Sequence, residues 1–427
     1  KNTLNAFSED YETLAHLFSQ LKDIRHSIRR CERGSLSEVE LFEIRQFLLQ
    51  LSRIVPAFER INAAAGFTGI SIAAVPEALH KLDMDGLESA GFYIDDGASP
   101  ALKEIRREKR ALEKRIRAAS GQERDALLRE RALLAAREDE EEAQVRTLLS
   151  ERLRPYAYEL LENADAIGLF DFTVARARLA RAYGAVKPEL CDEGISVSGM
   201  VNPRFADALK KKGKVFTPIS IELSRGATVV TGANMGGKSV ALKTLALTAL
   251  LVHAGIFPFA EHVKTQLFDR VLTLFEDLES AEKGLSSFGA EIVRLNEMLR
   301  ACDENSLVLI DELARGTNPY EGAQIVRAVA KRLNVLPSVS VLSTHYDHVA
   351  EYVNAHYQVK GLRGADMGAV KKEIAALPGD GVETVARHMN YGLIRAEADN
   401  PCPRDALNVC RLLGLDAAVM EEIEKLY

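Results

Sequence analysis

The chain lacks the cysteine pattern of a zinc site or a disulfide framework. Its 427 residues include five cysteines, which lie far apart and form no C-x-x-C pair. Zinc ligands and disulfide-rich domains need closely spaced cysteines, so we expect neither. This spacing is typical of a protein from a reducing cytosol, and we expect a cytoplasmic location.

Long apolar runs and an excess of positive charge are also missing. No apolar run approaches the ~18 residues that a membrane helix needs, and the first residues show no signal-peptide pattern, so we expect no membrane insertion. The formal net charge is −7. The chain therefore has no general attraction to nucleic acid, and DNA binding would need a local basic patch. The length and the 47% hydrophobic content predict a globular protein of two or three domains.

The stretch TVVTGANMGGKSV at residues 228–240 predicts a phosphate-binding loop. It fits the pattern G-x-x-x-x-G-K-[ST], with a β-branched run before it and a helix-forming segment after it. The glycines let backbone N–H groups surround phosphate oxygens at the positive end of a helix. Lys238 would reach the β- and γ-phosphates, and the Ser239 hydroxyl would bind Mg²⁺. The residues that match the pattern are Gly232, Gly237, Lys238 and Ser239.

Two later apolar runs end in polar residues, as buried parallel strands do beside a nucleotide. The run 307–310 precedes Asp311 and Glu312, and the run 339–344 precedes His345. We expect Asp311 to hold Mg²⁺, directly or through water, and Glu312 to orient or deprotonate the attacking water. We expect His345 to sense the γ-phosphate.

The N-terminal part of the chain is expected to be helical. Apolar residues at helical spacing predict a pair of helices in residues 1–60, with a break at Gly34 and with Ser35 or Ser37 as the second N-cap. Short β-branched runs appear only after residue 190, where we place a domain boundary. These runs are 195–197, 214–216 and 219–221.

Residues 100–154 predict an antiparallel helical hairpin whose arms meet at residues 119–122. The first arm is basic, and the second contains the acidic run 138–142. Either the arms pair by charge as a solvated coiled coil, or the basic arm contacts a phosphate backbone. The expected apolar seam consists of Leu102, Ile105, Leu112, Ile116, Leu127, Leu134 and Leu148.

Four motifs together resemble the ATPase core of MutS-type proteins, which belong to the ABC-related phosphate-loop ATPases. In chain order they are TGANMGGKS (231–239), LSSFGAE (285–291), DELARGTNPYEG (311–322) and STHY (343–346). The segment 98–100 and the stretch 175–190 look like the MutS branch linked to recombination suppression and ribosome rescue. The resemblance covers about residues 70–427 and is strongest over 215–360.

The resemblance implies an α/β ATPase domain at 191–400. It also implies an all-α core and lever domain at 1–190 and a helical dimerisation element at 401–427, with two helices broken at Gly414 and Asp416 as an N-cap. Glu312 and His345 would be the catalytic residues. Ser239 and Asp311 would bind Mg²⁺. The nucleotide-binding residues would be Phe216, which would stack on adenine, with Gly232, Ala233, Asn234, Met235, Gly236, Gly237, Lys238, Ser239, Val240, Ser286 and Ser287. Because Ser286 and Ser287 would reach the γ-phosphate of a partner subunit, an ATP-sandwich homodimer is expected.

Two functions remain open at this stage. The first is an ATP-gated dimer that binds and hydrolyses ATP and acts on DNA in mismatch repair or recombination. The second is a shortened MutS-like ATPase that reactivates a protein client such as a cobalamin-dependent aminomutase, without binding DNA. The directly joined hairpin arms, which leave no room for a DNA-gripping clamp, and the acidic balance favour the second, and the motif variants GANMGGKSVALKT and SSFGAE look closer to that subgroup.

Overall fold

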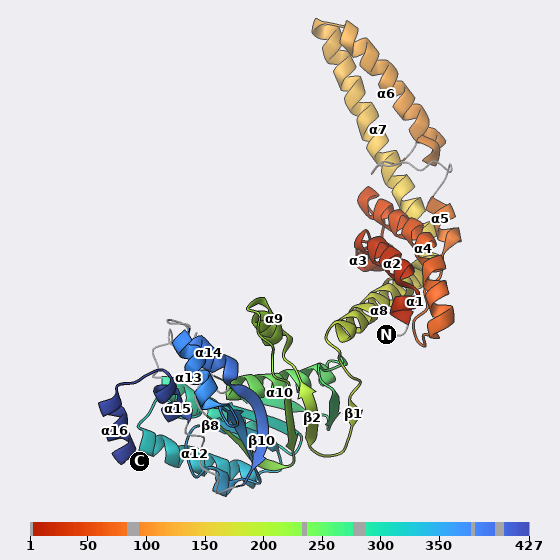
Figure 1. The fold of residues 1–427 in the computed structure, drawn as a ribbon. Helices are drawn as coiled ribbons and strands as arrows, with labels where there is room; N and C mark the ends of the chain where they lie inside the picture. Colours follow the sequence, from red (N-terminus) through yellow and green to blue (C-terminus); the bar gives the residue numbers. More distant parts are fainter. Residues whose placement is uncertain are drawn as a thin grey trace. The chain divides into compact units, whose positions relative to one another are not determined.

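The structure is a computed structural model that describes residues 3–82, 94, 96–232, 237–275, 287–376, 381–397 and 405–426. The chain divides into two compact units, Lys1–Arg178 and Leu179–Tyr427. The first unit is helical, and the second contains two β-sheets with helices packed on them (Figure 1). Our division of the chain at residues 190 and 400 stays a prediction. Within the described ranges, no helix is both long enough and apolar enough to cross a membrane.

The core of the first unit gathers around the Phe170 ring of α8. Four aromatic rings, those of Tyr11, Phe18, Phe58 and Phe67, lie within 6.3 Å of it, centroid to centroid. Such clusters contribute more than their buried area alone, because the rings meet edge to face or stacked. The helices are α1 (Thr3–Ala6), α2 (Ser8–Ser19), α3 (Arg25–Cys31), α4 (Glu38–Ala65), α5 (Pro76–Leu82), α6 (Pro100–Ala118), α7 (Gly121–Leu153) and α8 (Ala157–Ala182).

The prediction of two helices for residues 1–60 is wrong in number, since four are present there. The Asp23 carboxylate accepts a hydrogen bond from the Arg25 backbone amide at 3.1 Å, and this turn divides the first predicted helix into α2 and α3. The prediction of Ser37 as an N-cap is confirmed. Its hydroxyl accepts from the Glu40 amide while the Glu40 carboxylate accepts from the Ser37 amide, which forms a capping box.

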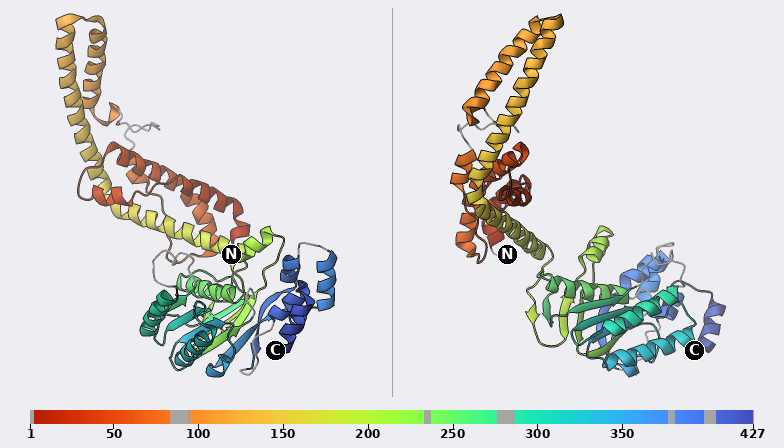
Figure 2. Two further views of the ribbon diagram at one scale, coloured as in Figure 1. Left: turned by 90° about the vertical axis from the view of Figure 1, so that its left-hand side faces the viewer. Right: turned by 180° about the vertical axis from the view of Figure 1, so that it is seen from behind.

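The antiparallel hairpin is confirmed by α6 and α7 (Figure 1 and Figure 2). Ion pairs cross between the arms in antiparallel order, from Arg106–Glu138 near the base to Arg131–Glu113 nearer the tip. Four of the predicted seam leucines are buried, but Leu148 is 42% exposed and its neighbour Leu149 is buried instead. An α-helix has 3.6 residues per turn, so positions spaced at exact multiples of seven residues gradually rotate away from the buried face.

A buried arginine joins the base of the hairpin. Arg106 is 4% exposed, and its guanidinium makes ion pairs with Asp96 (2.8 Å), Glu138 (3.0 Å) and Glu142 (2.7 Å). It also donates to the Ile94 carbonyl at 2.7 Å. The Arg106 hydrogen bond lowers the pKa of Asp96. Burial raises the pKa of Glu138, but the hydrogen bonds from Lys109 and Arg106 have the larger combined effect. The pKa of Glu138 is therefore also lowered.

We predict that Arg106→Met destabilises the hairpin by about 3 kcal/mol at pH 7, because it leaves partly buried carboxylates without their counter-charge. Carboxyls with a lowered folded-state pKa stabilise the fold above their unfolded pKa and lose that effect as the pH falls. The difference between parent and variant should therefore shrink as the pH falls from 7 to about 3. Amide hydrogen exchange in α6 and α7 measures both effects. The matched control is Arg107→Met, at a side chain that is 76% exposed, and an equal loss in both variants would contradict the prediction.

The second unit contains two sheets. The larger has six strands in the order β10-β9-β4-β8-β7-β6, all parallel except β10, and the smaller has the order β1-β5-β2-β3. The predicted change to mixed α/β structure is confirmed. The strands are β1 (Glu189–Leu190), β2 (Ile195–Met200), β3 (Ile219–Leu223), β4 (Gly226–Thr231), β5 (His262–Thr265), β6 (Arg270–Leu274), β7 (Ser306–Asp311), β8 (Val339–Thr344), β9 (Ala355–Gly361) and β10 (Asn390–Ala396).

The large sheet has an apolar core on each face because its central strands are buried on both sides. Val230, Leu307 and Val341 pack with α10 on one face, and their neighbours Val229, Val308 and Leu342 pack with α12 on the other. One predicted β-branched run, 214–216, is not a strand. It lies between α9 and β3, where Val215 is 89% exposed. The remaining helices are α9 (Pro203–Lys211), α10 (Lys238–His253), α11 (Ser287–Ala301), α12 (Pro319–Asn334), α13 (Met367–Ala376), α14 (Gly381–His388), α15 (Asp405–Leu412) and α16 (Ala417–Leu426).

The predicted pair of C-terminal helices is confirmed by α15 and α16. Gly414 lies between them with φ of 76°, a conformation that glycine adopts without strain. The Asp416 carboxylate accepts from the amides of Ala418 and Val419 and so caps α16. The role of this element in dimerisation stays a prediction.

Candidate functional site

The predicted site residues lie at the carboxyl ends of three parallel strands of the large sheet. In the register of the sheet, Thr231 of β4 lies beside Thr344 of β8, and Asp311 of β7 lies beside Ser343 of β8. Because parallel strands run in one direction, residues that follow their carboxyl ends meet at the same edge. The predicted neighbourhood of the phosphate-binding loop, Asp311, Glu312 and His345 is therefore present.

Two glycines of the loop occupy positions that other residues would strain. Gly232 follows β4 with φ of 155°, and a Cβ atom there would lie 2.9 Å from the Val359 Cβ. Gly237 precedes α10 in the left-handed region with φ of 86°, and a Cβ atom there would lie 3.1 Å from the Tyr391 ring. Open backbone at these two positions is what a loop needs in order to approach phosphate closely.

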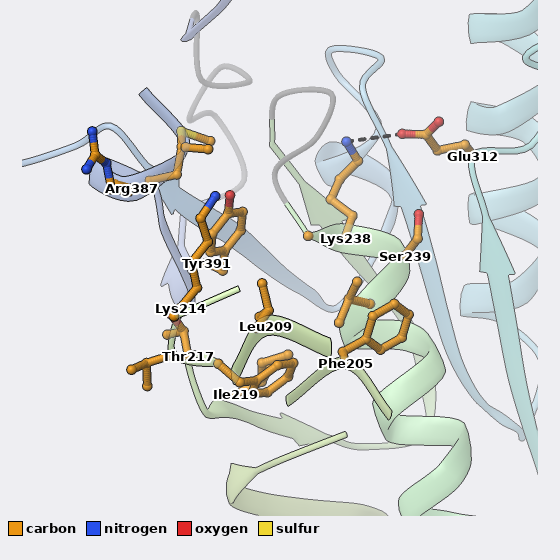
Figure 3. Close-up of a pocket in the computed structure, with 17 residues that line it drawn as sticks. Phe205, Leu209, Lys214, Thr217, Ile219, Lys238, Ser239, Glu312, Arg387 and Tyr391 are labelled. Carbon is orange, nitrogen blue, oxygen red and sulfur yellow. Dashed lines mark ion pairs between the residues drawn. The ribbon is translucent and has the colours of Figure 1, made fainter. Parts of the chain in front are cut away.

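Lys238 opens α10 and has a buried side chain, 2% exposed. Its ammonium donates to the Gly232 carbonyl at 2.8 Å and lies 3.2 Å from the Glu312 carboxylate. Figure 3 shows this ion pair across the end of the loop. A lysine in this position can exchange its carboxylate partner for phosphate oxygens.

Asp311 and Glu312 lie at the end of β7 and are both held by Ser343 of β8. The Ser343 hydroxyl donates to the Asp311 carboxylate, and the Glu312 amide donates to the Ser343 carbonyl at 3.1 Å. Glu312 has φ of 48°, a left-handed backbone that is uncommon for glutamate. Such backbone strain clusters at functional sites. Here it turns the chain sharply, so that two successive carboxylates occupy separate positions.

His345 follows β8, and its Nδ1 is buried without a hydrogen-bond partner among the described residues. Burial lowers the pKa of His345; the Lys238 charge lowers it further, and the Glu312 charge opposes the shift. The imidazole is therefore neutral near pH 7, with one ring nitrogen able to donate and the other to accept. This arrangement suits a residue that contacts a phosphate without binding it as a fixed cation.

A pocket of about 620 Å³ lies beside these residues. One part is formed by Gly237, Lys238 and Ser239 with Glu312, and the remainder is mostly apolar. The predicted adenine-stacking residue Phe216 and the loop residue Val240 are both in its lining. A polar end and an apolar body match the two parts of a nucleotide.

Comparison with known proteins identifies the family. The sequence pattern of MutS domain V matches residues 228–410, which contain the loop, both carboxylates and His345. This match and the relatives below support a member of the MutS family. The resemblance inferred from its motifs is confirmed.

The relatives of this chain include several proteins named Endonuclease MutS2, which support the MutS2 branch. The protein from Levilactobacillus brevis is 35% identical over 218 residues, which is 50% of this chain and 27% of the relative. That from Thermomicrobium roseum is 31% identical over 306 residues, 69% of this chain and 36% of the relative. That from Enterococcus faecalis is 28% identical over 403 residues, which is 78% of this chain and 49% of the relative. The chain thus spans about a quarter to a half of the relatives' length.

Some predicted site residues of this chain lie outside the described residues. Ser287 is the first residue of α11, and its side chain is not described. The roles of all these residues stay predictions. The positions outside the described ranges are Ala233, Asn234, Met235, Gly236 and Ser286.

The predicted Mg²⁺ ligands fit the chemistry of that ion. Among the described residues, no group of three or more His, Cys, Asp or Glu side chains could hold a metal by itself. Ser239 and Asp311 nevertheless offer a hydroxyl and a carboxylate, and Mg²⁺ takes oxygen ligands and usually keeps waters and substrate phosphates. Few protein ligands are therefore enough.

The sequence analysis missed one wall of the pocket. Arg387 of α14, Met389 just before β10 and Tyr391 of β10 line the pocket from a segment about 150 residues after the loop. Lys214, Phe205 and Leu209 line it from the region of α9. These residues follow no nucleotide motif. The one available signal was that Phe216, which the resemblance did single out, is a close neighbour of Lys214 in the sequence.

Proposed function

We propose that this protein binds and hydrolyses ATP with Mg²⁺ as an ATP-gated homodimer that acts on DNA. The observation that carries the proposal is the buried Lys238–Glu312 pair at the mouth of a glycine loop, 3.2 Å between charged atoms. A lysine that can bind phosphate and a carboxylate that can activate water lie in direct contact at the end of the glycine loop. The match of residues 228–410 to MutS domain V supports the same function.

The residues at the carboxyl ends of β4, β7 and β8 have different roles in the proposed reaction. When ATP enters, Lys238 leaves Glu312 for the β- and γ-phosphates, and the Glu312 carboxylate becomes available to a water molecule. Glu312 orients that water and accepts its proton as the new bond to phosphorus forms and the bond to the bridging oxygen of ADP breaks. Neutral His345 donates to the γ-phosphate. Ser239 and Asp311 would hold Mg²⁺, which would supply positive charge to balance the charge that develops on the phosphates.

We propose the dimer because the motif LSSFGAE (285–291) resembles the family segment that reaches the nucleotide of a partner subunit. We propose that Ser286 and Ser287 of one subunit complete the site of the other, so that ATP is sandwiched between two ATPase domains. Closure would then depend on nucleotide, and the helical units would move with it. The name of the relatives, Endonuclease MutS2, supports nucleic acid as the ligand of these units. No finding favours the alternative of an aminomutase or another protein client.

The test is steady-state ATP hydrolysis by the purified chain, with and without duplex or branched DNA. We expect hydrolysis in Mg²⁺, and several-fold stimulation by DNA that is lost between about 50 and 200 mM salt, since salt weakens phosphate contacts. Glu312→Gln is the control for contaminating ATPases. Turnover that is indifferent to every DNA at low salt would contradict the DNA part of the proposal, and absence of turnover would contradict all of it.

A further inference from the structure

The backbone turn that follows β7 contains two residues in the left-handed region. Glu312 has φ of 48° and Ala314 has φ of 62°. Left-handed backbone is costly for residues that carry a Cβ atom, so contacts with neighbouring elements must stabilise this turn. Leu313 and Ala314 are buried, 1% and 0% exposed. The position of the Glu312 side chain therefore depends on the groups that fix the backbone of Ala314.

Glu291 of α11 contacts the amide of Ala314. Its Oε2 accepts a hydrogen bond from this amide at 3.0 Å. The helix also packs beside the turn, because Ile292 and Leu295 pack in the same apolar cluster as Ala314. Hydrogen bonds to charged acceptors are stronger than those to neutral ones, and a buried amide that loses its acceptor is destabilising. Glu291 is thus placed to stabilise the left-handed turn.

Tyr346, two residues after β8, contacts the carbonyl of the same residue. Its hydroxyl donates to the Ala314 carbonyl at 3.4 Å, and the Thr317 amide donates to that carbonyl at 3.5 Å. Burial raises the pKa of Tyr346 and the Glu291 charge raises it further, so the hydroxyl keeps its proton and can donate. A Cβ atom at Gly322 would lie 2.5 Å from this hydroxyl oxygen, so glycine leaves room for the contact.

Three of the four motifs found in the sequence therefore meet at Ala314. Glu291 is the last residue of LSSFGAE and Tyr346 is the last residue of STHY, while Ala314 lies within DELARGTNPYEG. The reaction proposed above gives no role to Glu291 or Tyr346. Their contacts nevertheless join α11 and the end of β8 to the turn that carries Glu312.

We propose that Glu291 and Tyr346 are positioning residues that fix the backbone of Ala314 and so aim the Glu312 carboxylate at the attacking water. The inference rests on the proposed function, in which Glu312 is the general base. Glu291 acts here as a hydrogen-bond acceptor and takes no part in proton transfer.

The turn matters most when ATP is bound. Without nucleotide, the Glu312 carboxylate lies 3.2 Å from the Lys238 ammonium and 3.4 Å from the Arg315 guanidinium. Lys238 leaves this pair in the proposed reaction, and the Arg315 side chain is 56% exposed, so that its ion pair is weak. The backbone turn is then the main constraint on the position of the base.

Two replacements of Glu291 give different predictions. Glu291→Ala removes the acceptor and should slow hydrolysis by about 30-fold, since a displacement of about 1 Å in a catalytic group can cost on the order of 100-fold. Glu291→Gln keeps an oxygen that can accept from the Ala314 amide, so it should slow hydrolysis by no more than about threefold. Affinity for the non-hydrolysable β,γ-imido analogue of ATP should stay within about twofold in both variants, because the contact acts on the reaction and not on binding.

A double variant tests the backbone strain itself. Ala314→Gly removes the Cβ atom that disfavours φ of 62°, so the turn needs less support from Glu291. Glu291→Ala combined with Ala314→Gly should hydrolyse ATP about fivefold faster than Glu291→Ala alone. If Glu291 stabilised only its own helix, a glycine in the turn would restore nothing.

The experiment measures single-turnover hydrolysis by the full chain, with the protein in excess over ATP, and calorimetric titration with the imido analogue. Glu297→Ala is the matched control, since Glu297 is an exposed glutamate of α11, and its rate should stay within about twofold of the parent. Circular dichroism confirms that each variant is folded. Should Glu291→Ala not fold, Tyr346→Phe removes a single hydroxyl and is expected to slow hydrolysis by about fivefold at unchanged affinity.

The outcomes separate the inference from the proposed function. If the parent hydrolyses ATP and Glu291→Ala matches Glu297→Ala, the inference is overturned and the proposed function stands. Equal losses in Glu291→Ala and Glu291→Gln also overturn it, because the side chain then acts through its charge. A double variant no faster than Glu291→Ala overturns the role of the turn. If the parent does not hydrolyse ATP, the proposed function fails and the inference fails with it.

Discussion

Replacing Lys238 with alanine is expected to weaken ATP binding by roughly 100-fold or more, since hydrogen bonds to charged groups are among the stronger ones that proteins make. The lysine is 2% exposed and placed between the loop backbone and Glu312. Its removal has a second effect in the same direction. The Glu312 carboxylate loses the cation that lies 3.2 Å away, so an incoming phosphate meets less attraction and more repulsion.

Lys243→Ala is the matched control for this experiment. Lys243 lies on the same helix, α10, but it is exposed and its ammonium lies 5.9 Å from the centre of the Phe275 ring. Each variant removes one lysine from α10, but of these two lysines only Lys238 contacts the loop. Titration with a fluorescent ATP analogue measures both affinities. An affinity for Lys238→Ala within threefold of the control would refute the assignment of the loop.

Replacing Glu312 with glutamine should have the opposite pattern, with binding retained and turnover lost. Removal of a general base typically slows a reaction by about 10²–10⁴-fold. The amide keeps the shape of the side chain but cannot accept the proton of the attacking water. It also releases Lys238 from its ion pair, so ATP should bind at least as tightly as to the parent. Single-turnover hydrolysis and titration with ATP measure the two quantities separately.

Glu321→Gln provides the comparison for the second prediction. Glu321 lies in the first turn of α12, shortly after Glu312 in the chain, and is exposed. We expect its turnover to stay within about twofold of the parent, as for most surface substitutions. If Glu312→Gln hydrolyses ATP at a rate comparable to that of Glu321→Gln, the general base is another residue. The mechanism proposed for Glu312 is then wrong.

The sequence predicts the parts of the site that depend on local chemistry. A glycine loop, a lysine at the start of a helix, and carboxylates at the ends of buried strands each leave a pattern within a few residues. The hairpin is predictable for the same reason, because apolar spacing and alternating charge lie within one continuous segment. The capping box of Ser37 and Glu40 likewise needs only four successive residues.

What the sequence did not predict depends on contacts between distant segments. The wall formed by Arg387, Met389 and Tyr391 exists because β10 pairs antiparallel with β9 and so reaches the glycine loop. No pattern near these residues encodes that pairing. Leu148 was assigned to the seam in place of Leu149 because small deviations from a seven-residue repeat accumulate along a helix. The extra helix break lies at Asp23, whose carboxylate accepts hydrogen bonds from the backbone and the side chain of Arg25.

The strand order has a consequence for synthesis of the protein. Strand β10 supplies Tyr391, which lies against Gly237 at the base of the pocket, and it leaves the ribosome long after the loop does. At ~5–20 residues added per second, that interval is on the order of ten seconds or more. During it, the nascent chain carries a phosphate loop without its opposite wall. Nucleotide can therefore help to complete folding only late in translation, when the last strand of the sheet has joined its edge.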